Sequence, residues 1–241
     1  MSGHSKFANI KHRKEKNDSA KGKIFTIIGR ELAVAVKEGG ADPNNNSRLR
    51  DVIAKAKAAN MPGANIQRAI DRVADKNAAV MEEITYEGYG PGGVGIIIET
   101  ATDNRNRTLP EVKTALVKNG GRIADAGSVA FQFTRKGVIT VNGNGEDLLM
   151  EVLEAGAEDA VEQDGAIIVY TEQKDLAAVR TALIGQGVKI KDAGLQYIAN
   201  TPVEVADVDT ANKLLKVLDA LDDLDDVVDV YTNADITADI A

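Results

Sequence analysis

The chain has 241 residues, of which 44% are hydrophobic and 27% charged, and its formal net charge is −8. The absence of cysteine excludes disulfide bonds, thiol nucleophiles and cysteine-based metal sites, and two histidines are too few for a histidine-rich metal centre. No stretch approaches the roughly 20 apolar residues of a membrane span, and the amino terminus has no signal-peptide-like apolar run. We therefore expect a cytoplasmic protein with no membrane partner.

The charge is distributed very unevenly along the chain. Residues 1–76 carry 16 lysines and arginines against 8 acidic residues, whereas residues 77–241 carry 13 against 29. This asymmetry predicts an anionic partner at the amino-terminal end, most simply nucleic acid. The acidic remainder should repel that partner and so determine which face of the protein is presented to it.

Three helices are predicted in the basic region, because apolar residues recur there every three or four positions. They span residues 18–37, about 46–59 and about 64–74, and the sequence Met61-Pro62-Gly63 separates the last two. These helices predict an all-α domain that, with the preceding arm, covers residues 1–76.

The pattern changes to strands and helices from residue 82 onward. The expected elements of this second region are strands 84–88, 93–102 and 128–134 with helix 108–118, followed near the end of the chain by helix 208–221 and strand 227–231. Between these two groups lies a series in the order βαββαβ, which is the ferredoxin-like arrangement. Its expected elements are strand 137–141, helix 146–154, strands 157–162 and 166–171, helix 173–186 and strand 188–197.

The predicted fold class is therefore α+β, with an N-terminal three-helix domain followed by two α+β, ferredoxin-like domains, one inserted in the other. The expected boundaries are 1–76 for the helical domain, 77–135 plus 202–241 for the discontinuous α+β domain, and 136–201 for the inserted domain.

The amino-terminal arm is the sharpest local signal for function. Cations at phosphates release condensed counterions, and the neighbouring polar groups suit phosphate or sugar. Phe7 either stacks on a base or packs against the helical domain, although an aromatic content of only 4% disfavours an extensive stacking platform. The candidate nucleic-acid-binding residues here are Ser5, Lys6, Phe7, Asn9, Lys11, His12, Arg13, Lys14, Lys16, Lys21 and Lys23.

Two further segments have both a functional and a structural interpretation. Residues 103–107 follow a strand and lead into a helix, so Arg105 and Arg107 are candidates for a second contact with an anion, or the segment is a loop with a helix cap. The glycine-rich stretch 88–95 lacks the Gly-Lys-Ser/Thr ending of a phosphate-binding loop and precedes a strand, which favours a turn between strands.

No catalytic constellation is evident. The acidic segment near residues 219–229 does not have the spacing of a calcium-binding loop, and no Ser/His/Asp set or metalloprotease motif is present. We predict a protein that is not an enzyme, with no cofactor, no bound metal and no small-molecule substrate.

Several motifs carry a resemblance to a known family. GHSKFANIKHRK at the start, NMPGANIQRAI (60–70), YEGYGPGGVG (86–95), TDNRNRT (102–108) and KNGGRIADAGSVAFQF (118–133) resemble the YebC/PmpR family in order and over essentially the whole length. There are two departures: Phe7 stands where Trp is usual, and Pro110 is expected in the first turn of the helix that follows TDNRNRT, near position N1.

The resemblance implies a cytoplasmic protein of three domains around a central cleft. Members of this family are generally described as probable transcriptional regulators that bind DNA. The family also includes mitochondrial translational activators, and bacterial relatives are linked to the ribosome, where they help elongation through stalling sequences such as proline runs.

Two functions follow as alternatives. The first is a DNA-binding transcriptional regulator, although the helix near Arg48, Arg50, Lys55 and Lys57 is only a weak candidate for a recognition helix. The second is a ribosome-associated translation factor that binds ribosomal RNA, since an arm of this composition reads shape and phosphate better than sequence.

Overall fold

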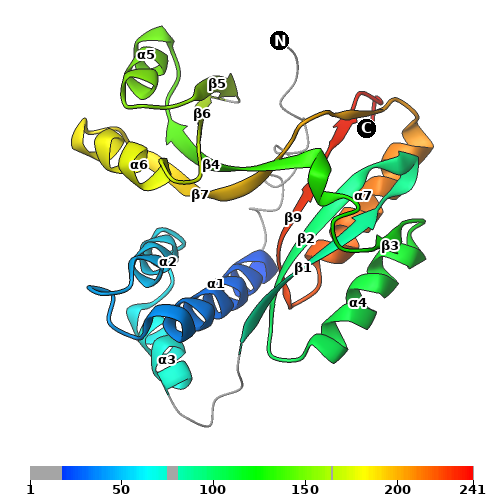
Figure 1. Ribbon diagram of the computed structural model, residues 1–241, viewed down its shortest axis with the longest axis horizontal. Coiled ribbons are helices and arrows are strands. Elements are labelled where there is room, and N and C mark those ends of the chain that lie inside the picture. Colours follow the sequence, from blue (N-terminus) through cyan, green and yellow to red (C-terminus); the bar gives the residue numbers. More distant parts are fainter. Residues whose placement is uncertain (1–17, 75–80, 164, 241) are drawn as a thin grey trace. The chain divides into compact units, whose positions relative to one another are not determined.

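The computed structural model describes residues 18–74, 81–163 and 165–240 (Figure 1). The chain divides into two compact units. One is formed by the residues up to Gln132 together with those from Thr201 onward, and the other by Phe133–Asn200.

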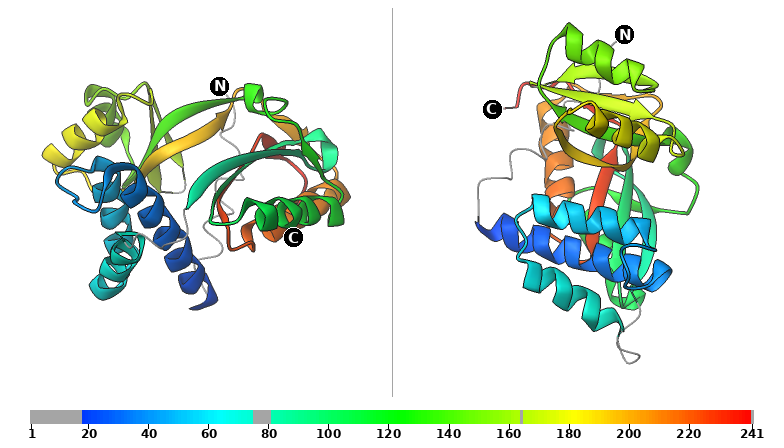
Figure 2. Two further views of the ribbon diagram at one scale, coloured as in Figure 1. Left: turned by 60° about the horizontal axis from the view of Figure 1, so that its bottom comes forward. Right: turned by 90° about the vertical axis from the view of Figure 1, so that its left-hand side faces the viewer.

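The first unit begins with three helices, α1 (Asp18–Gly39), α2 (Ser47–Ala58) and α3 (Gly63–Ala74). Helices α2 and α3 both pack along α1 (Figure 2). Their shared core is formed by apolar side chains at helical spacing, among them Ile28, Leu32, Leu49, Ile66 and Ile70.

Asn46 fixes the corner between α1 and α2. It caps α2 by accepting a hydrogen bond from the Leu49 N–H at 3.0 Å, and its amide donates to the carbonyls of Ala35 (2.7 Å) and Gly40 (2.8 Å). These bonds satisfy helix-terminal backbone groups that would otherwise lack partners. A Cβ at Gly39 would lie only 2.7 Å from the Asn46 side chain, so any larger residue there would displace Asn46.

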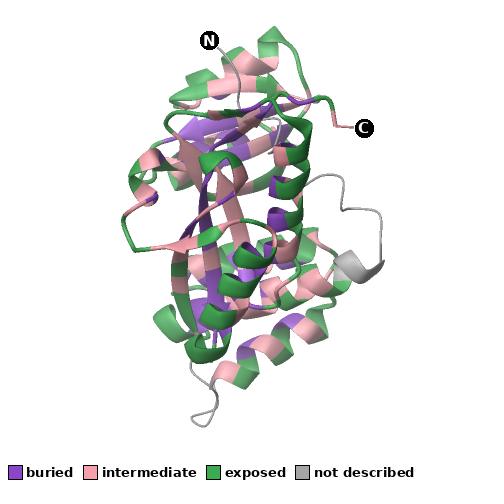
Figure 3. Cartoon of the chain, turned by 90° about the vertical axis from the view of Figure 1, so that its right-hand side faces the viewer, coloured by how far each residue is buried: buried purple, intermediate pink, exposed green. Residues whose placement is uncertain are grey.

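The rest of the first unit is built around a four-stranded antiparallel sheet. Its order is β3 (Arg122–Ala124), β1 (Glu82–Tyr89), β2 (Gly95–Thr102) and β9 (Val227–Thr232). Helices α4 (Arg105–Lys118) and α7 (Val208–Asp222) join it in one hydrophobic core, which includes Ile96, Ile98, Leu116, Leu214 and Leu221. Figure 3 shows the buried residues along the strands and on one side of the helices. Strands β8 (Val203–Val205) and β10 (Ala234–Ile236) form a separate parallel pair.

The second unit has the order β4 (Phe133–Asn142), α5 (Glu146–Glu154), β5 (Asp159–Gln163), β6 (Ala166–Thr171), α6 (Leu176–Gly185) and β7 (Ile190–Ala199). Its antiparallel sheet has the spatial order β5-β6-β4-β7. This is the ferredoxin-like split βαβ arrangement. The core includes Ile139, Ile167, Val169 and Leu183. The predicted fold class, α+β with an N-terminal helical region followed by sheet domains, is confirmed.

One strand prediction was wrong. The expected strands 128–134 and 137–141 are a single strand, β4, which begins only at Phe133, and residues 130–132 before it form a short 3₁₀ helix, η4 (Ala130–Gln132). The alternating apolar pattern resembled a strand, but the backbone N–H groups of Val129 and Ala130 bind a side chain rather than a neighbouring strand. The short strands β3, β8 and β10 were not predicted.

The position expected for Pro110 was also wrong. Asn104 caps α4 by accepting from the Arg107 N–H, so the helix begins at Arg105 and Pro110 lies inside it, beyond the first turn. A proline there removes one hydrogen bond of the helix, and its ring restricts the turn before it.

Candidate nucleic-acid interface

Most of the predicted arm falls outside the described part of the chain. This applies to Ser5, Lys6, Phe7, Asn9, Lys11, His12, Arg13, Lys14 and Lys16, and also to the side chain of Lys21. Lys23 lies in α1 and is half-buried. The assignment of these residues to nucleic-acid binding therefore stays a prediction.

Two cations of the weak recognition-helix candidate are held by carboxylates. Arg48 forms ion pairs with Glu38, at 2.7 Å, and with Glu83. Burial opposes the charge of Arg48, but these two glutamates outweigh it and raise the pKa of the guanidinium. Lys55 pairs with Glu31 at 2.8 Å. Half of the cations near the weak recognition-helix candidate are thus already engaged within the protein.

Four other cations of α2 and α3 are exposed: Arg50, Lys57, Arg68 and Arg72. Arg50 donates to the backbone carbonyl of Pro43, and Arg68 donates to the carbonyl of Ala64 and to Asn65. None of the four forms an ion pair with a carboxylate of the described residues. We call them the basic helical surface.

Arg50 and Lys57 were expected only near a weak candidate for a recognition helix, and Arg68 and Arg72 were not predicted as binding residues, although the spacing of the four is a signal. Arg50 and Lys57 are seven residues apart on α2, and Arg68 and Arg72 are four apart on α3, so each pair shares a helix face. Exposed cations that form no ion pair within the described part of the chain are available for phosphate oxygens.

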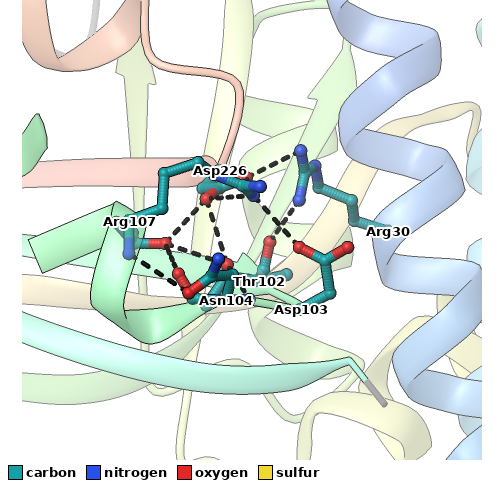
Figure 4. A network of polar contacts seen from close by, with 8 residues as sticks. Arg30, Thr102, Asp103, Asn104, Arg107 and Asp226 are labelled. Carbon is teal, nitrogen blue, oxygen red and sulfur yellow. Dashed lines mark hydrogen bonds and ion pairs between the residues drawn. The ribbon is translucent and has the colours of Figure 1, made fainter. Parts of the chain in front are cut away.

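A network of ion pairs and hydrogen bonds surrounds Asp226, in the turn before β9. Its carboxylate lies 2.7 Å from Arg30 of α1 and 2.9 Å from Arg107 of α4, and both guanidinium groups point toward it in Figure 4. The hydroxyls of Thr108 and Thr102 donate to it at 2.6 and 3.0 Å. We call this arrangement the Asp226 clamp.

The clamp keeps a buried carboxylate ionised. Asp226 is only 2% exposed, and burial by itself would raise its pKa. The hydrogen bonds from Thr108 and Arg107, together with the charge of Arg30, outweigh burial and lower the pKa of Asp226. Arg30 also donates to the carbonyl of Ala101 in β2 at 2.9 Å, so the same guanidinium ties α1 to the sheet twice.

The structure brings the two predicted arginines of the TDNRNRT segment into different surroundings. Arg107 bridges Asp226 and Asp103, and these carboxylates raise the pKa of its guanidinium. Arg105 is exposed. The partial burial of Tyr86 raises the pKa of that hydroxyl, and the positive charge of Arg105 acts in the opposite direction. Arg107 is thus engaged within the protein, whereas Arg105 remains accessible.

A second buried carboxylate organises the loop between β3 and β4. Glu87 of β1 is 7% exposed and accepts three backbone hydrogen bonds, from Gly127 (2.6 Å), Val129 (2.6 Å) and Ala130 (2.8 Å). Burial would raise the pKa of Glu87, but these three N–H groups lower it. Gly127 has φ +84°, a left-handed conformation that other residues adopt at a cost.

The glycine-rich stretch is the turn that its sequence predicted. The Gly90 N–H donates to the carbonyl of Val94 at 2.8 Å, and Gly92 and Gly93 both have positive φ between β1 and β2. Among the described residues, no group of three or more His, Asp or Glu side chains is placed to hold a metal ion. No helix in the described ranges is long and apolar enough to cross a membrane.

Comparison with known proteins covers almost the entire chain. Residues 5–76 match the family model described as the TACO1/YebC protein N-terminal domain, and residues 81–234 match that of the TACO1/YebC second and third domain. A probable transcriptional regulatory protein from Moorella thermoacetica is 49% identical over 100% of this chain and 98% of its own length. One from Desulfitobacterium hafniense is 47% identical over the same shares.

A solved structure has the same fold. The crystal structure of a conserved hypothetical protein from Aquifex aeolicus superposes with a TM-score of 0.88 at 40% sequence identity. The likeness covers 92% of this chain and 93% of that one.

Proposed function

Since this chain belongs to the TACO1/YebC family, whose curated relatives are named probable transcriptional regulatory proteins, we propose that it is a non-enzymatic regulator that binds DNA. The observation that carries this proposal is the basic helical surface. Its four exposed cations lie in the positively charged part of a chain whose net charge is negative. In this proposal the protein acts in the cytoplasm.

The arm and the basic helical surface would bind the phosphate backbone together. Each cation placed on a phosphate releases condensed counterions, which gives affinity that falls as salt rises. Lys11, Arg13 and Lys14 of the arm would add to Arg50 and Lys57 on α2. Arg105, next to the Asp226 clamp, would supply a further contact from the α+β part.

A ribosome-associated translation factor that binds ribosomal RNA is the second candidate. The observation that favours it is the engagement of Arg48 and Lys55 by glutamates, which leaves α2 with few side chains for reading base edges. A surface of this kind recognises phosphate and shape, and structured RNA is recognised largely through those features.

Crosslinking in cells followed by sequencing of the bound nucleic acid separates the two candidates. The intact chain is compared with one lacking residues 2–16. Arm-dependent crosslinks at discrete promoter DNA support the transcriptional regulator. Crosslinks concentrated in ribosomal RNA instead support the translation factor and make effects on transcription indirect. If neither kind of crosslink appears, the nucleic-acid proposal is wrong.

A binding assay in vitro tests the electrostatic basis. Replacing Lys11, Arg13 and Lys14 together with alanine should weaken binding and leave the melting temperature unchanged. If about five phosphates are engaged on duplex DNA, log affinity against log salt should have a slope of roughly −4 to −5. The double variant Arg50→Gln/Lys57→Gln should make that slope shallower by about 2, whereas a slope near zero in the unaltered protein would contradict the mechanism.

A further inference from the structure

The loop at residues 125–132 is anchored along its length although it reaches the surface. Beyond the three backbone hydrogen bonds to the carboxylate of β1 described above, the side chain of Val129 is fully buried. The hydroxyl of Tyr89 donates to the carbonyl of Ser128 at 2.8 Å. The side-chain carbonyl of Gln132 accepts from the amide of Asn233 at 2.7 Å. The backbone of this loop is therefore held in one conformation.

This anchored loop presents an aromatic side chain to solvent. Phe131 is 72% exposed, more than any other large hydrophobic side chain of the described residues. Its neighbours on both sides, Ala130 and Gln132, are the ones held by hydrogen bonds. A ring on a fixed backbone loses little conformational freedom when a partner binds it, which favours binding.

A cation, Arg122, lies on the edge strand β3, close to the same loop. The guanidinium of Arg122, an exposed residue of β3, lies 4.7 Å from the centre of the Tyr89 ring. Stacking on an aromatic face orients a guanidinium while its N–H edge stays available. The Tyr89 hydroxyl is in turn 3.5 Å from the side-chain nitrogen of Gln132, next to Phe131.

We propose that Phe131 and Arg122 form a second contact for nucleic acid, in which Phe131 stacks on an unpaired base and Arg122 binds an adjacent phosphate. This inference rests on the proposed function and adds a preference for unpaired nucleotides that the helical surface does not supply. An apolar pocket of a protein would also accept a phenylalanine, but the accompanying Arg122 favours a polyanion. Because every base has an aromatic face, the contact tolerates any sequence.

The test uses two hairpins that differ in one group. Both carry a single-nucleotide bulge, with a base in one and an abasic site in the other, so the phosphates are identical. The intact protein should bind the hairpin with the base more tightly, by about 5- to 150-fold, the range of one base–aromatic stack. Phe131→Ala should abolish that ratio, and its melting temperature should be unchanged. Val117→Ala, at another exposed apolar position (55%), is the matched control and should keep the ratio.

A fluorescent variant gives an independent readout. The chain contains no tryptophan, so F131W introduces a single reporter. Its fluorescence should be quenched by the hairpin with the base and much less by the abasic one, and the variant should retain the affinity ratio. Unchanged fluorescence at saturation, or an equal ratio in Phe131→Ala and the unaltered protein, would overturn the stacking contact.

The remaining comparisons separate this inference from the proposed function. Arg122→Gln should weaken binding to both hairpins alike and make the salt slope shallower by about 1. Deleting residues 2–16 should weaken binding to both while preserving the ratio. If the intact protein binds neither hairpin, in DNA or in RNA form, the proposed function fails. If it binds both equally, only the stacking contact fails, and the two forms show which nucleic acid is preferred.

Discussion

Two carboxylates of the first unit, Asp226 and Glu87, are buried and ionised, but they are stabilised in different ways. Asp226 is bound by side chains that come from segments far away in the sequence, with Arg107 separated from it by 119 residues. Glu87 is bound by backbone N–H groups of one loop. The first arrangement joins helix α1 to the sheet, whereas the second gives one loop its shape.

This difference predicts different consequences when each carboxylate is lost. Removing Asp226 leaves two arginines close together, one of them largely buried, so the damage should extend to the connection between α1 and the sheet. Removing Glu87 leaves three backbone N–H groups of one loop without their acceptor, so the damage should stay within the loop at residues 125–132.

The largest effect is expected for Asp226→Ala. Breaking a buried ion pair by removing one partner typically costs about 3–5 kcal/mol of the free energy of unfolding, since the other charge is left uncompensated. Chemical denaturation measures this loss. Asp225→Ala, at the exposed neighbouring position, is the control and should change stability by about 0.5 kcal/mol or less. Equal losses in both variants would mean that the clamp contributes nothing.

Glu87→Gln should have a smaller and more local effect, about 1–3 kcal/mol, the cost of leaving buried hydrogen-bonding groups poorly matched. Hydrogen exchange should accelerate at Gly127, Val129 and Ala130 and remain unchanged in α1. Glu82→Gln on the same strand, where the side chain is exposed, is the matched control. Faster exchange throughout the unit would show that the loop and the core are not separate.

The free energy of unfolding at low pH should show the contribution of both carboxylates. Each has a pKa in the folded protein below its ordinary value, which is 3.8 for Asp226 and 4.5 for Glu87. Their contribution to stability is therefore complete above the unfolded pKa and is lost as pH falls through the folded pKa. Below about pH 4 the unaltered protein should lose stability more steeply than Asp226→Asn. Parallel curves measured from pH 6 to pH 2 would contradict the assigned direction.

The smallest effect is expected at an exposed pair of the second unit. Lys136 contacts Glu158 at 2.6 Å, and about half of the Glu158 side chain is exposed. Exposed ion pairs contribute little because water and salt screen them, so Glu158→Gln should change the free energy of unfolding by less than about 0.5 kcal/mol. A loss as large as that of Glu87→Gln would show that buried and exposed carboxylates of this protein contribute equally to stability.

The sequence predicted those elements whose pattern is local. Strand β2 contains a run of isoleucines, and α1–α3 show apolar residues at helical spacing, so their approximate limits followed from periodicity. The turn at Gly90–Val94 followed from its glycines in the same way. The sequence motifs also predicted the family, and the family models that match the chain confirm it.

Only the tertiary structure decided the contacts between distant segments. The pattern Val129, Phe131, Phe133 looked like a strand, but the backbone N–H groups of Val129 and Ala130 bind Glu87 of β1 rather than a neighbouring strand. Arg107 looked available for an anion until folding placed Asp226 beside it. Periodicity reports which side of an element is apolar, whereas the partner of a charge depends on chain segments that meet only after folding.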